Sequence, residues 1–392
     1  MTLHFGRWTA ATCVKPIQPS RPSIHVSSAP GDESRAPDRM GHDKPMKSTD
    51  AAPRELDCVI IGGGAAGLSA AVNMGRMRRS VLLVDERDRF LWRHMIHNYL
   101  GFPDGIPAAD IRRLGWRQAA RFGVELLVGH VATATREDDR FRIRIDRLPE
   151  GGAFANRPGP KIPRDAEMAR MFADVPEGGP MDVIARTVIL APGVFGHFPE
   201  FPGRDECVGQ SLFWCIHCDG YESIDRVVGV VGHDEDAVQT ALELTVFTDH
   251  VTIVAGRPEG FDVPAARLAE LAASGIAAHA GAVAEYENRD GQMQALVLDD
   301  AARTRIPVEQ VYTIRGTRAS NDLARQLGLE LASNGQIVVT SEQHTNVPGA
   351  YAAGDATNLH DHQISAAAHE GAQAAWGANY HLYASMQRAP GD

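Results

Sequence analysis

The sequence predicts an α/β fold with two Rossmann-type domains, each with helices on both faces of a parallel sheet, in three layers. Two observations carry this prediction. A buried strand, a glycine-rich turn, a helix and a second buried strand follow one another from Leu56, and a similar unit begins at Val227. Such βαβ units build parallel sheets that are covered by helices.

The first unit can be followed element by element. Residues 56–61 form a short apolar run, typical of a strand buried on both faces, and Gly62-Gly63-Gly64 ends it. Small residues over 65–76 favour a helix, and residues 81–84 form the next buried strand. The elements expected after it are a helix over 110–122, a strand over 141–145, a loop insertion over 147–180 and a strand over 187–190.

The second unit repeats this order. We expect a strand over 227–231, a turn at Gly232, a helix over 237–247 and a strand over 251–254. The elements expected after it are strands near Val311 and over 337–339, and a C-terminal helix from about Gln363.

Composition excludes several classes of protein. The chain has 392 residues, of which 44% are hydrophobic and 23% charged, as in soluble globular proteins of two or three domains. A net charge of −11 argues against nucleic-acid binding, which requires clustered cations. No run approaches the ~20 apolar residues of a membrane span, and the first residues lack the apolar centre of a secretory signal. We therefore expect a cytoplasmic protein that binds neither nucleic acid nor membrane.

The N-terminal extension differs from the rest of the chain. Residues 1–54 are rich in proline, serine and charge, with no apolar periodicity. Such a segment buries too little apolar surface to offset its ordering entropy, so we expect it to be disordered. Met40 and Met46 are alternative start positions that the sequence leaves open.

The turn after the first strand carries a nucleotide-binding signature. Gly62 through Gly67 reads G-x-G-x-x-G between a strand and a helix. Gly62 permits the tight turn, Gly64 lets a pyrophosphate approach the backbone, and Gly67 lets helix and strand pack closely. The helix N-terminus offers free N–H groups to the anion. Asp85, at the end of the next strand, has the spacing of a ribose-binding acid, so we predict an adenine dinucleotide here.

Two cysteines suggest redox chemistry. Cys215 and Cys218 are spaced C-x-x-C and are followed by Asp219. Such a pair can close and reopen a disulfide, and Asp219 is placed to move the protons. Zinc is the rival interpretation, but one C-x-x-C is half a site and His217 within the same loop has poor geometry. The sequence therefore favours redox chemistry over a metal.

These motifs occur in the order of the low-molecular-weight thioredoxin reductases, which the chain resembles over residues 56–385. Residues 345–355 resemble the strand whose closing aspartate, here Asp355, contacts the flavin ribityl chain. Ala191-Pro192-Gly193 resembles the family's A-T-G crossing motif, and Gln363-Ile364 resembles the start of the helix that points at the flavin. The resemblance implies FAD as cofactor, a homodimer and two domains that rotate during turnover.

The resemblance also implies the roles of single residues. Cys218 takes electrons from the flavin, Cys215 exchanges with the substrate, and Asp219 acts as acid and base. The substrate would be a thioredoxin-like protein or a small-molecule dithiol or disulfide. The predicted cofactor-binding residues are Gly62, Gly64, Ala65, Ala66, Gly67, Asp85, Glu86, Asn98, Ala191, Gly193, Gly354, Asp355, Gln363 and Ile364.

The predicted domain division follows from the same comparison. Residues 55–197 and 311–385 form a discontinuous FAD-binding domain. Residues 198–310 form the inserted, NAD(P)H-binding-like domain that carries the cysteine pair.

The second nucleotide motif departs from the family pattern. The family's G-x-G-x-x-A reads Gly232 to Ala237 here, with Asp234 in place of the middle glycine. A carboxylate there repels a pyrophosphate, and of the cations that bind a 2′-phosphate only Arg257 remains. A weak NADPH or NADH site would use Gly232, His233, Ala237 and Arg257. The alternatives are a dithiol oxidase or a ferredoxin-linked relative with a degenerate NADPH site, or a non-catalytic flavin redox sensor.

Several further residues remain open. Trp92, His97 and Tyr99 lie where the family contacts the flavin, although Trp92 and Tyr99 fit a core equally well. Cys58 is expected to be inert, while a resolving role for Cys207 stays open. No metal is predicted, because the spacing of the C-terminal histidines does not place three on one helix face; they are His344, His360, His362 and His369. Of these, His362 is expected near the flavin.

Overall fold

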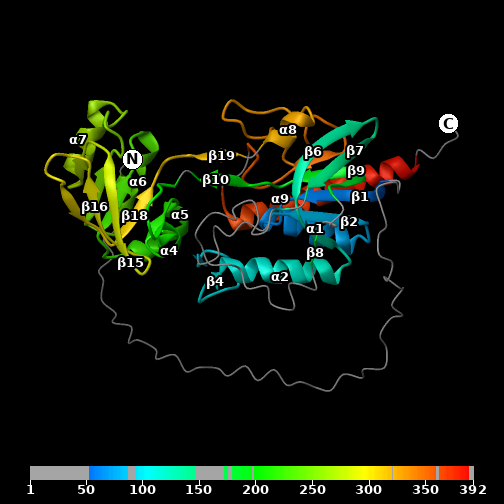
Figure 1. Cartoon of the computed structure of the whole chain (residues 1–392), viewed down its shortest axis with the longest axis horizontal. Helices are drawn as coiled ribbons and strands as arrows, with labels where there is room; N and C mark the ends of the chain where they lie inside the picture. Colours follow the sequence, from blue (N-terminus) through cyan, green and yellow to red (C-terminus); the bar gives the residue numbers. More distant parts are fainter. Residues whose placement is uncertain are drawn as a thin grey trace, which may run out of the picture. The chain divides into compact units, whose positions relative to one another are not determined.

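The computed structural model describes residues 53–86, 94–146, 148, 172–174, 179–196, 198–319, 321–358 and 362–387. Within them the chain forms two large β-sheets and three smaller ones, with helices packed on the large sheets (Figure 1), which confirms the predicted α/β fold class. Most of the predicted N-terminal extension, the segment with Trp92, and His360 lie outside these residues. The first strand begins at Arg54, one residue inside the extension predicted to be disordered.

The first sheet has the strand order β6-β7-β9-β1-β2-β5-β8, and β20 pairs with β9. Its strands are β1 (Arg54–Ile61), β2 (Val81–Asp85), β5 (Glu125–Val128), β6 (His130–Glu137), β7 (Arg140–Asp146), β8 (Phe172–Asp174), β9 (Met181–Leu190) and β20 (Ala350–Ala352). Parallel pairing of β1 with β2 and β9 places the carboxyl ends of all three at one edge. The strand β8 lies inside the predicted loop insertion, most of which falls outside the described residues.

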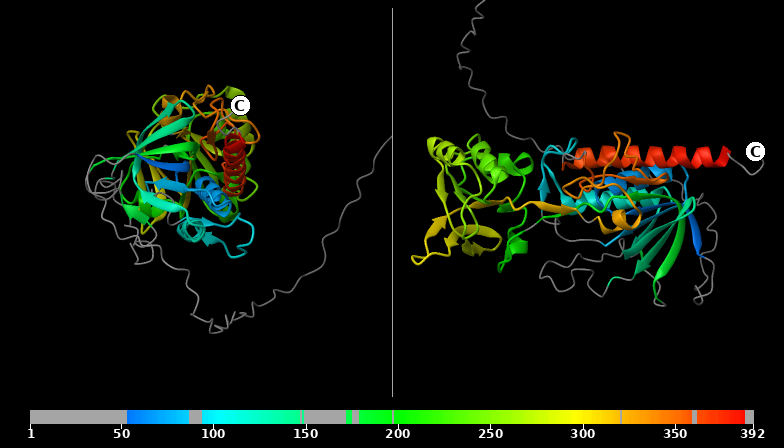
Figure 2. Two further views of the ribbon diagram at one scale, coloured as in Figure 1. Left: turned by 90° about the vertical axis from the view of Figure 1, so that its right-hand side faces the viewer. Right: turned by 90° about the horizontal axis from the view of Figure 1, so that it is seen from above.

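Of the helices in the described residues, α1 (Ala65–Arg76), α2 (Ala108–Arg121) and α9 (Ile364–Gln387) pack on this sheet. The helix α9 runs along α1 (Figure 2) at very close range. A Cβ on Gly371 of α9 would lie 2.0 Å from the Ala66 carbonyl oxygen, so glycine is required there. Small residues on both helices therefore bring the C-terminal segment against the start of α1.

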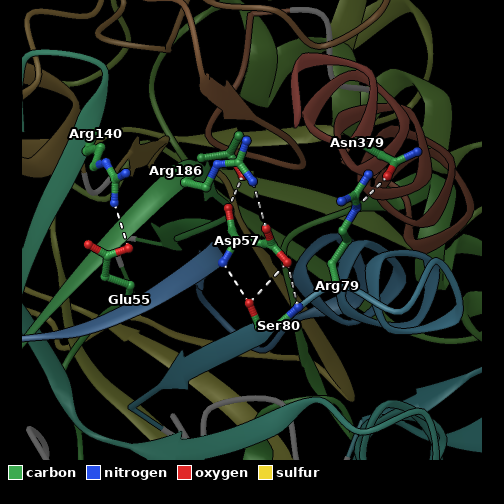
Figure 3. Close-up of polar contacts among 8 residues, drawn as sticks. Glu55, Asp57, Arg79, Ser80, Arg140, Arg186 and Asn379 are labelled. Atoms are coloured by element: carbon green, nitrogen blue, oxygen red, sulfur yellow. Dashed lines mark hydrogen bonds and ion pairs between the residues drawn. The ribbon is translucent and has the colours of Figure 1, made fainter. Parts of the chain in front are cut away.

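Hydrogen bonds link several elements at the amino edge of this sheet (Figure 3). The Asp57 carboxylate accepts hydrogen bonds from the Ser80 backbone N–H at 3.0 Å and from Arg186 at 3.3 Å. Arg79 Nε donates to Asn379 of α9 at 2.8 Å. These contacts join β1, β9, α9 and the turn before β2 at the amino edge of the sheet. In folds of this kind ligands bind at the opposite, carboxyl edge.

The second sheet has the order β11-β18-β12-β13-β14. Its strands are β11 (Leu212–Phe213), β12 (Val228–Val231), β13 (Val251–Val254), β14 (Ala277–His279) and β18 (Gln310–Thr313), and a smaller sheet contains β15 (Val283–Arg289), β16 (Gln292–Leu298) and β17 (Arg305–Pro307). The helices of this part are α4 (Arg204–Cys207), α5 (Ile216–Asp219), η1 (Gly220–Ser223), α6 (Glu235–Leu244) and α7 (Ala265–Ala273).

Two sequence expectations need correction. The predicted domain boundary after residue 310 is displaced, because β18 pairs with β11 and β12 and so belongs to the second sheet. The strand expected over 337–339 is absent: Ile337 makes only isolated bridges, to Leu331 and Thr357, although it is fully buried. Ile337 and Val339 instead lie in a segment without regular strands, between the short helix α8 (Asp322–Gln326) and β20, and pack into the hydrophobic core of the first sheet.

The chain crosses between the two sheets twice. The crossings contain β10 (Val194–Gly196) and β19 (Thr317–Ala319), which pair antiparallel (Figure 1). A further short pair, β3 (Met95–Ile96) with β4 (Ile106–Pro107), precedes α2. No helix of the described segments combines the length and the apolarity needed to cross a membrane.

Candidate functional site

The glycine turn lies at the carboxyl edge of the first sheet. Gly62 has φ 105°, and a Cβ on it would lie 2.1 Å from the Ala191 carbonyl oxygen. Gly64 is the N-cap of α1 and has no side chain with which to cap the helix, and a Cβ there would meet nothing within 4 Å. Gly193, with φ 69°, faces similarly open space. The turn therefore has both the tight backbone and the room that a pyrophosphate requires.

The predicted ribose acid, Asp85, and the neighbouring cofactor-binding candidate, Glu86, differ in their surroundings. Asp85 is buried at the end of β2 and accepts a hydrogen bond from Arg112 at 2.9 Å. Its carboxylate also lies against Gly63, where a Cβ would come within 2.4 Å of Oδ2. Glu86 lies 2.5 Å from the imidazole of His130, and this contact raises the pKa of His130. Of the two carboxylates, Asp85 is the one beside the glycine turn.

The C-terminal residues meet the same edge. The Gly354 N–H donates to Glu370 of α9 at 2.6 Å, and a Cβ on Gly354 would lie 3.0 Å from that of Ala66. Asp355 follows at the turn, with its carboxylate 3.8 Å from His362 Nδ1. The predicted residues from the glycine turn, the crossing motif and the C-terminal turn are thus brought together although they lie far apart in the sequence.

The start of α9 approaches the cysteine pair. Cys215 and Cys218 form the predicted disulfide, and both are half-buried. The Gln363 amide nitrogen lies 3.5 Å from Cys218 Sγ and 4.0 Å from Cys215 Sγ. Asn98 donates to the Gln363 side-chain oxygen at 2.8 Å. Cys218 is therefore the cysteine nearer the residues that the sequence assigns to the flavin.

A buried polar pair stands beside the disulfide. Asp219 ends α5, and its Oδ1 lies 3.3 Å from Nε2 of His94, with side-chain exposures of 5% and 12%. Burial, and then the charge of Glu222, raise the pKa of Asp219 to about 8. Burial, and then His97, lower the pKa of His94 to about 4. At neutral pH the two side chains therefore form a neutral pair that holds one proton on the carboxyl group.

Sequence reasoning missed His94. It lies 125 positions before Asp219 and belongs to no recognised motif, so no spacing signal connects the two. The imidazole ring centre lies 5.8 Å from that of Trp214, the residue before the cysteine pair. A Cβ on Gly209 would lie 2.8 Å from the His94 Cα, so a glycine is needed for this approach.

A cavity of about 890 Å³ opens beside Cys218. Its walls come from the loop after β3, the cysteine-bearing turn and the end of α6; they are His97, Asn98, Pro103, Ile216, His217, Cys218, Tyr221, Glu222, Glu243, Val246 and Phe247. This volume is in the range of small-molecule sites. Its lining combines apolar side chains with two carboxylates, two imidazoles and an amide, and includes one cysteine of the pair.

The second nucleotide motif is closed by its own side chain. Asp234 is the N-cap of α6, and its carboxylate accepts a hydrogen bond from the Ala237 N–H at 3.1 Å. Arg257 donates to the Gly260 carbonyl at 2.8 Å and lies 3.9 Å from Asp262. The backbone carbonyl of His233 accepts from the Asp262 N–H. The residues of the expected weak nucleotide site are thus engaged with neighbours in their own loops.

The remaining candidates have structural surroundings. Cys207 is fully buried among apolar side chains, and burial raises the pKa of its thiol to about 11. Cys58 is likewise buried, with a pKa of about 12. Tyr99 packs on the small apolar cluster around Ile96. Across the described ranges, no group of three or more His, Cys, Asp or Glu side chains could hold a metal ion.

Comparisons with known proteins agree with this geometry. Residues 56–375 match the family model for pyridine nucleotide-disulphide oxidoreductases. A thioredoxin reductase of Treponema pallidum is 26% identical over 327 residues, covering 82% of this chain and 95% of the relative. An alkyl hydroperoxide reductase protein of Xanthomonas campestris is 27% identical over 350 residues, or 87% of this chain and 60% of that protein.

Solved structures show the same fold. The crystal structure of HlmI superposes with a TM-score of 0.70 at 26% identity, covering 86% of this chain and 96% of HlmI. The thioredoxin reductase of Streptococcus pyogenes gives a TM-score of 0.70 at 22% identity over 85% of this chain and all of that one. The chain belongs to the pyridine nucleotide-disulphide oxidoreductase family and is an FAD-dependent thiol–disulfide oxidoreductase.

Proposed function

We propose that the protein moves electron pairs between FAD and an external thiol or disulfide through Cys215 and Cys218, as in thioredoxin reductases. The observation that carries this proposal is the contact of Cys218 Sγ, at 3.5 Å, with the amide nitrogen of Gln363, a residue expected at the flavin. Cys218 is accordingly the cysteine that exchanges electrons with the flavin, and Cys215 is the one that exchanges with the substrate.

The residues at the first sheet fit FAD. Gly64 and Gly193 leave open space for the cofactor, and the first N–H groups of α1 have no side-chain cap. Asp85 and Asp355 offer carboxylates at the ends of β2 and β20, where hydroxyl groups of a ribose and a ribityl chain would be bound. When bound, FAD supplies or accepts the two electrons of the reaction.

The chain's own residues manage the sulfur chemistry. Two electrons break the Cys215–Cys218 bond, and two protons complete the dithiol. Asp219, protonated at neutral pH, gives one of them, and solvent gives the other. The ionised Asp219 takes back a proton from the Cys215 thiol, and the resulting thiolate attacks the external disulfide and expels one thiolate. This thiolate takes the proton of Cys218, and Cys218 then attacks the mixed disulfide, which restores the pair and releases the second thiolate to be protonated by solvent. The reverse sequence oxidises a dithiol.

The external electron carrier is the second part of the proposal. Because Asp234 occupies the Ala237 N–H, the second nucleotide site is expected to bind NADPH or NADH weakly. This favours, as a second candidate, dithiol oxidation with the second domain serving as a scaffold for the cysteine pair. The cavity at the cysteine-bearing turn has the volume of a small-molecule site but is lined by Cys218 and not by Cys215, so a small dithiol would reach Cys215 from outside it. A thioredoxin-like protein would likewise need Cys215 to be presented to it.

An anaerobic titration separates the two directions. The holoenzyme is titrated with NADPH, then NADH, then dithiothreitol, and the flavin absorbance is followed. Bleaching by stoichiometric NADPH supports a reductase, and bleaching by dithiothreitol alone supports an oxidase. Cys218→Ser should abolish bleaching by dithiothreitol, while Cys215→Ser, the matched control, keeps the flavin-facing sulfur and loses exchange with the external substrate. Full dithiol turnover in Cys218→Ser would overturn the proposed roles.

We also propose a homodimer, as the resemblance implies. Helix α9 exposes three aromatic side chains at positions four and three residues apart: Trp376 (46%), Tyr380 (72%) and Tyr383 (51%). A stripe of this kind is typical of an interface core, and a second copy of the chain is the occupant we propose. Light scattering should give twice the chain mass, and Tyr380→Glu should halve it. An unchanged mass in that variant would place the interface elsewhere.

A further inference from the structure

The strongest unassigned feature is the pair formed by His94 and Asp219. The two side chains come from different parts of the fold: His94 precedes β3, beside the first sheet, and Asp219 follows Cys218. Their 3.3 Å contact is almost completely removed from solvent. Buried polar groups are rarely juxtaposed without a structural or chemical reason, and the proposed function uses only one member of this pair.

The contact has one favoured direction once Asp219 is ionised. His94 Nδ1 and Asp219 Oδ2 are both buried and have no hydrogen-bond partner among the described residues. In that state an N–H on Nδ1 would be buried without an acceptor, whereas an N–H on Nε2 meets the carboxylate, so we assign the imidazole proton to Nε2. His94 then donates to Asp219 Oδ1. Such a bond stabilises the carboxylate that remains after Asp219 has given its proton away.

We propose that His94 is a positioning residue for Asp219: its Nε2–H holds the carboxyl group beside the cysteine pair and stabilises the carboxylate left after proton transfer. This inference rests on the proposed role of Asp219 and extends it. In one half-turnover, the Asp219 O–H bond breaks as an S–H bond forms on the reduced pair. The proton returns from the dithiol, or from solvent, when the disulfide closes again.

The balance of surrounding groups supports this role. Glu222, on η1, opposes charge on Asp219, and Tyr312 of β18 lies close enough for Asp219 to raise its pKa. His97 opposes a positive charge on His94. The Glu222 carboxylate lies 3.8 Å from His97. Burial and Glu222 both disfavour the Asp219 carboxylate. A donor at Oδ1 would favour it, and His94 is the side chain placed there.

The test compares a deletion of the donor with its replacement. In the holoenzyme, the rate of flavin reduction by dithiothreitol is measured against pH for wild type, His94→Leu and His94→Gln. His94→Leu should move the alkaline limb, near pH 8 in wild type, upward by about one pH unit and lower the rate at neutral pH by about tenfold. His94→Gln retains an N–H donor and should restore most of the wild-type position of the alkaline limb and most of the wild-type rate at neutral pH. The control His250→Gln, an exposed site, should match wild type.

A second readout does not depend on turnover. The infrared band of the protonated carboxyl group, identified by its loss in Asp219→Asn, should persist to higher pH in His94→Leu. An unmoved band and pH profile would overturn the inference, as would equal behaviour of the leucine and glutamine variants, which would assign His94 to packing. Full turnover in Asp219→Asn would instead overturn the proposed acid and leave the cysteine roles standing.

Discussion

A single buried carboxyl group links the chemistry of this protein to its stability. The pKa of Asp219 is raised, first by burial, to about 8 from 3.8. The folded state therefore holds a proton that the unfolded state releases. Below about pH 4 both states are protonated and the group has no effect. Between about pH 4 and pH 8 the unfolded state gains by ionising, so the free energy of unfolding falls as the pH rises.

Removing this ionisation should stabilise the fold most at high pH. Asp219→Asn preserves size and cannot ionise, so we expect a gain on the order of a few kcal/mol at pH 8 and little change at pH 4. Thermal unfolding of the protein at both pH values measures it. Asp249→Asn, at an exposed position, should change the melting temperature equally little at both. A gain for Asp219→Asn that is independent of pH would contradict the pKa assigned to this group.

Among the elements, α6 is the one whose cap conflicts with the expected ligand. The Asp234 carboxylate satisfies the Ala237 N–H and places a negative charge where a pyrophosphate would bind. Gly232 still permits the tight turn, since a Cβ there would come within 2.6 Å of the Ile314 carbonyl. The strand–turn–helix geometry of a nucleotide site is thus retained, and the Asp234 side chain occupies the position of the pyrophosphate.

Asp234→Gly should reopen this site. We expect the affinity for NADPH to rise by at least tenfold, because the substitution removes a repelling charge and frees the N–H groups, at a cost of a few tenths of a kcal/mol in stability. Flavin bleaching during an NADPH titration provides the measurement. Asp236→Asn removes a charge from the same turn without freeing Ala237 N–H, and serves as the control. Equal affinities in Asp234→Gly and wild type would show that another feature blocks the nucleotide.

The elements also show what could be predicted from sequence. The glycine turns, the cysteine pair and the strands of the two βαβ units were predicted correctly, because their signals lie within a few neighbouring residues. Many shorter strands, among them the three of the small sheet over 283–307, were not predicted. Two predictions were wrong because the same sequence pattern fits two structures. The short strand at 310–313 could belong to either sheet, and the apolar run at 337–339 could form a strand or a buried loop. The pair of His94 and Asp219 could not be predicted, because only the tertiary fold brings together residues so distant in sequence.

At the scale of the whole chain, the two crossings between the large sheets pair with each other. The strands β10 and β19 pair with each other over Val194–Gly196 and Thr317–Ala319. A glycine with positive φ precedes each strand: Gly193 at 69° and Gly316 at 73°. A Cβ on either would meet nothing within 4 Å, so these glycines are required by backbone conformation rather than by space. We infer that the domain rotation implied by the family would occur at this ribbon.

Gly316→Val should therefore affect large substrates more than small ones. Valine disfavours positive φ, so it restricts the backbone at one crossing; we expect reduction of a thioredoxin to slow by about tenfold, while reduction of the flavin by dithiothreitol changes little. Gly328→Val is the matched control, because Gly328 has φ 70° with similarly open space but lies at the end of α8, away from the ribbon. Steady-state rates with both substrates, on variants of equal flavin content, give the comparison. If both variants slow the two reactions alike, backbone strain alone accounts for the effect and the ribbon is not the hinge.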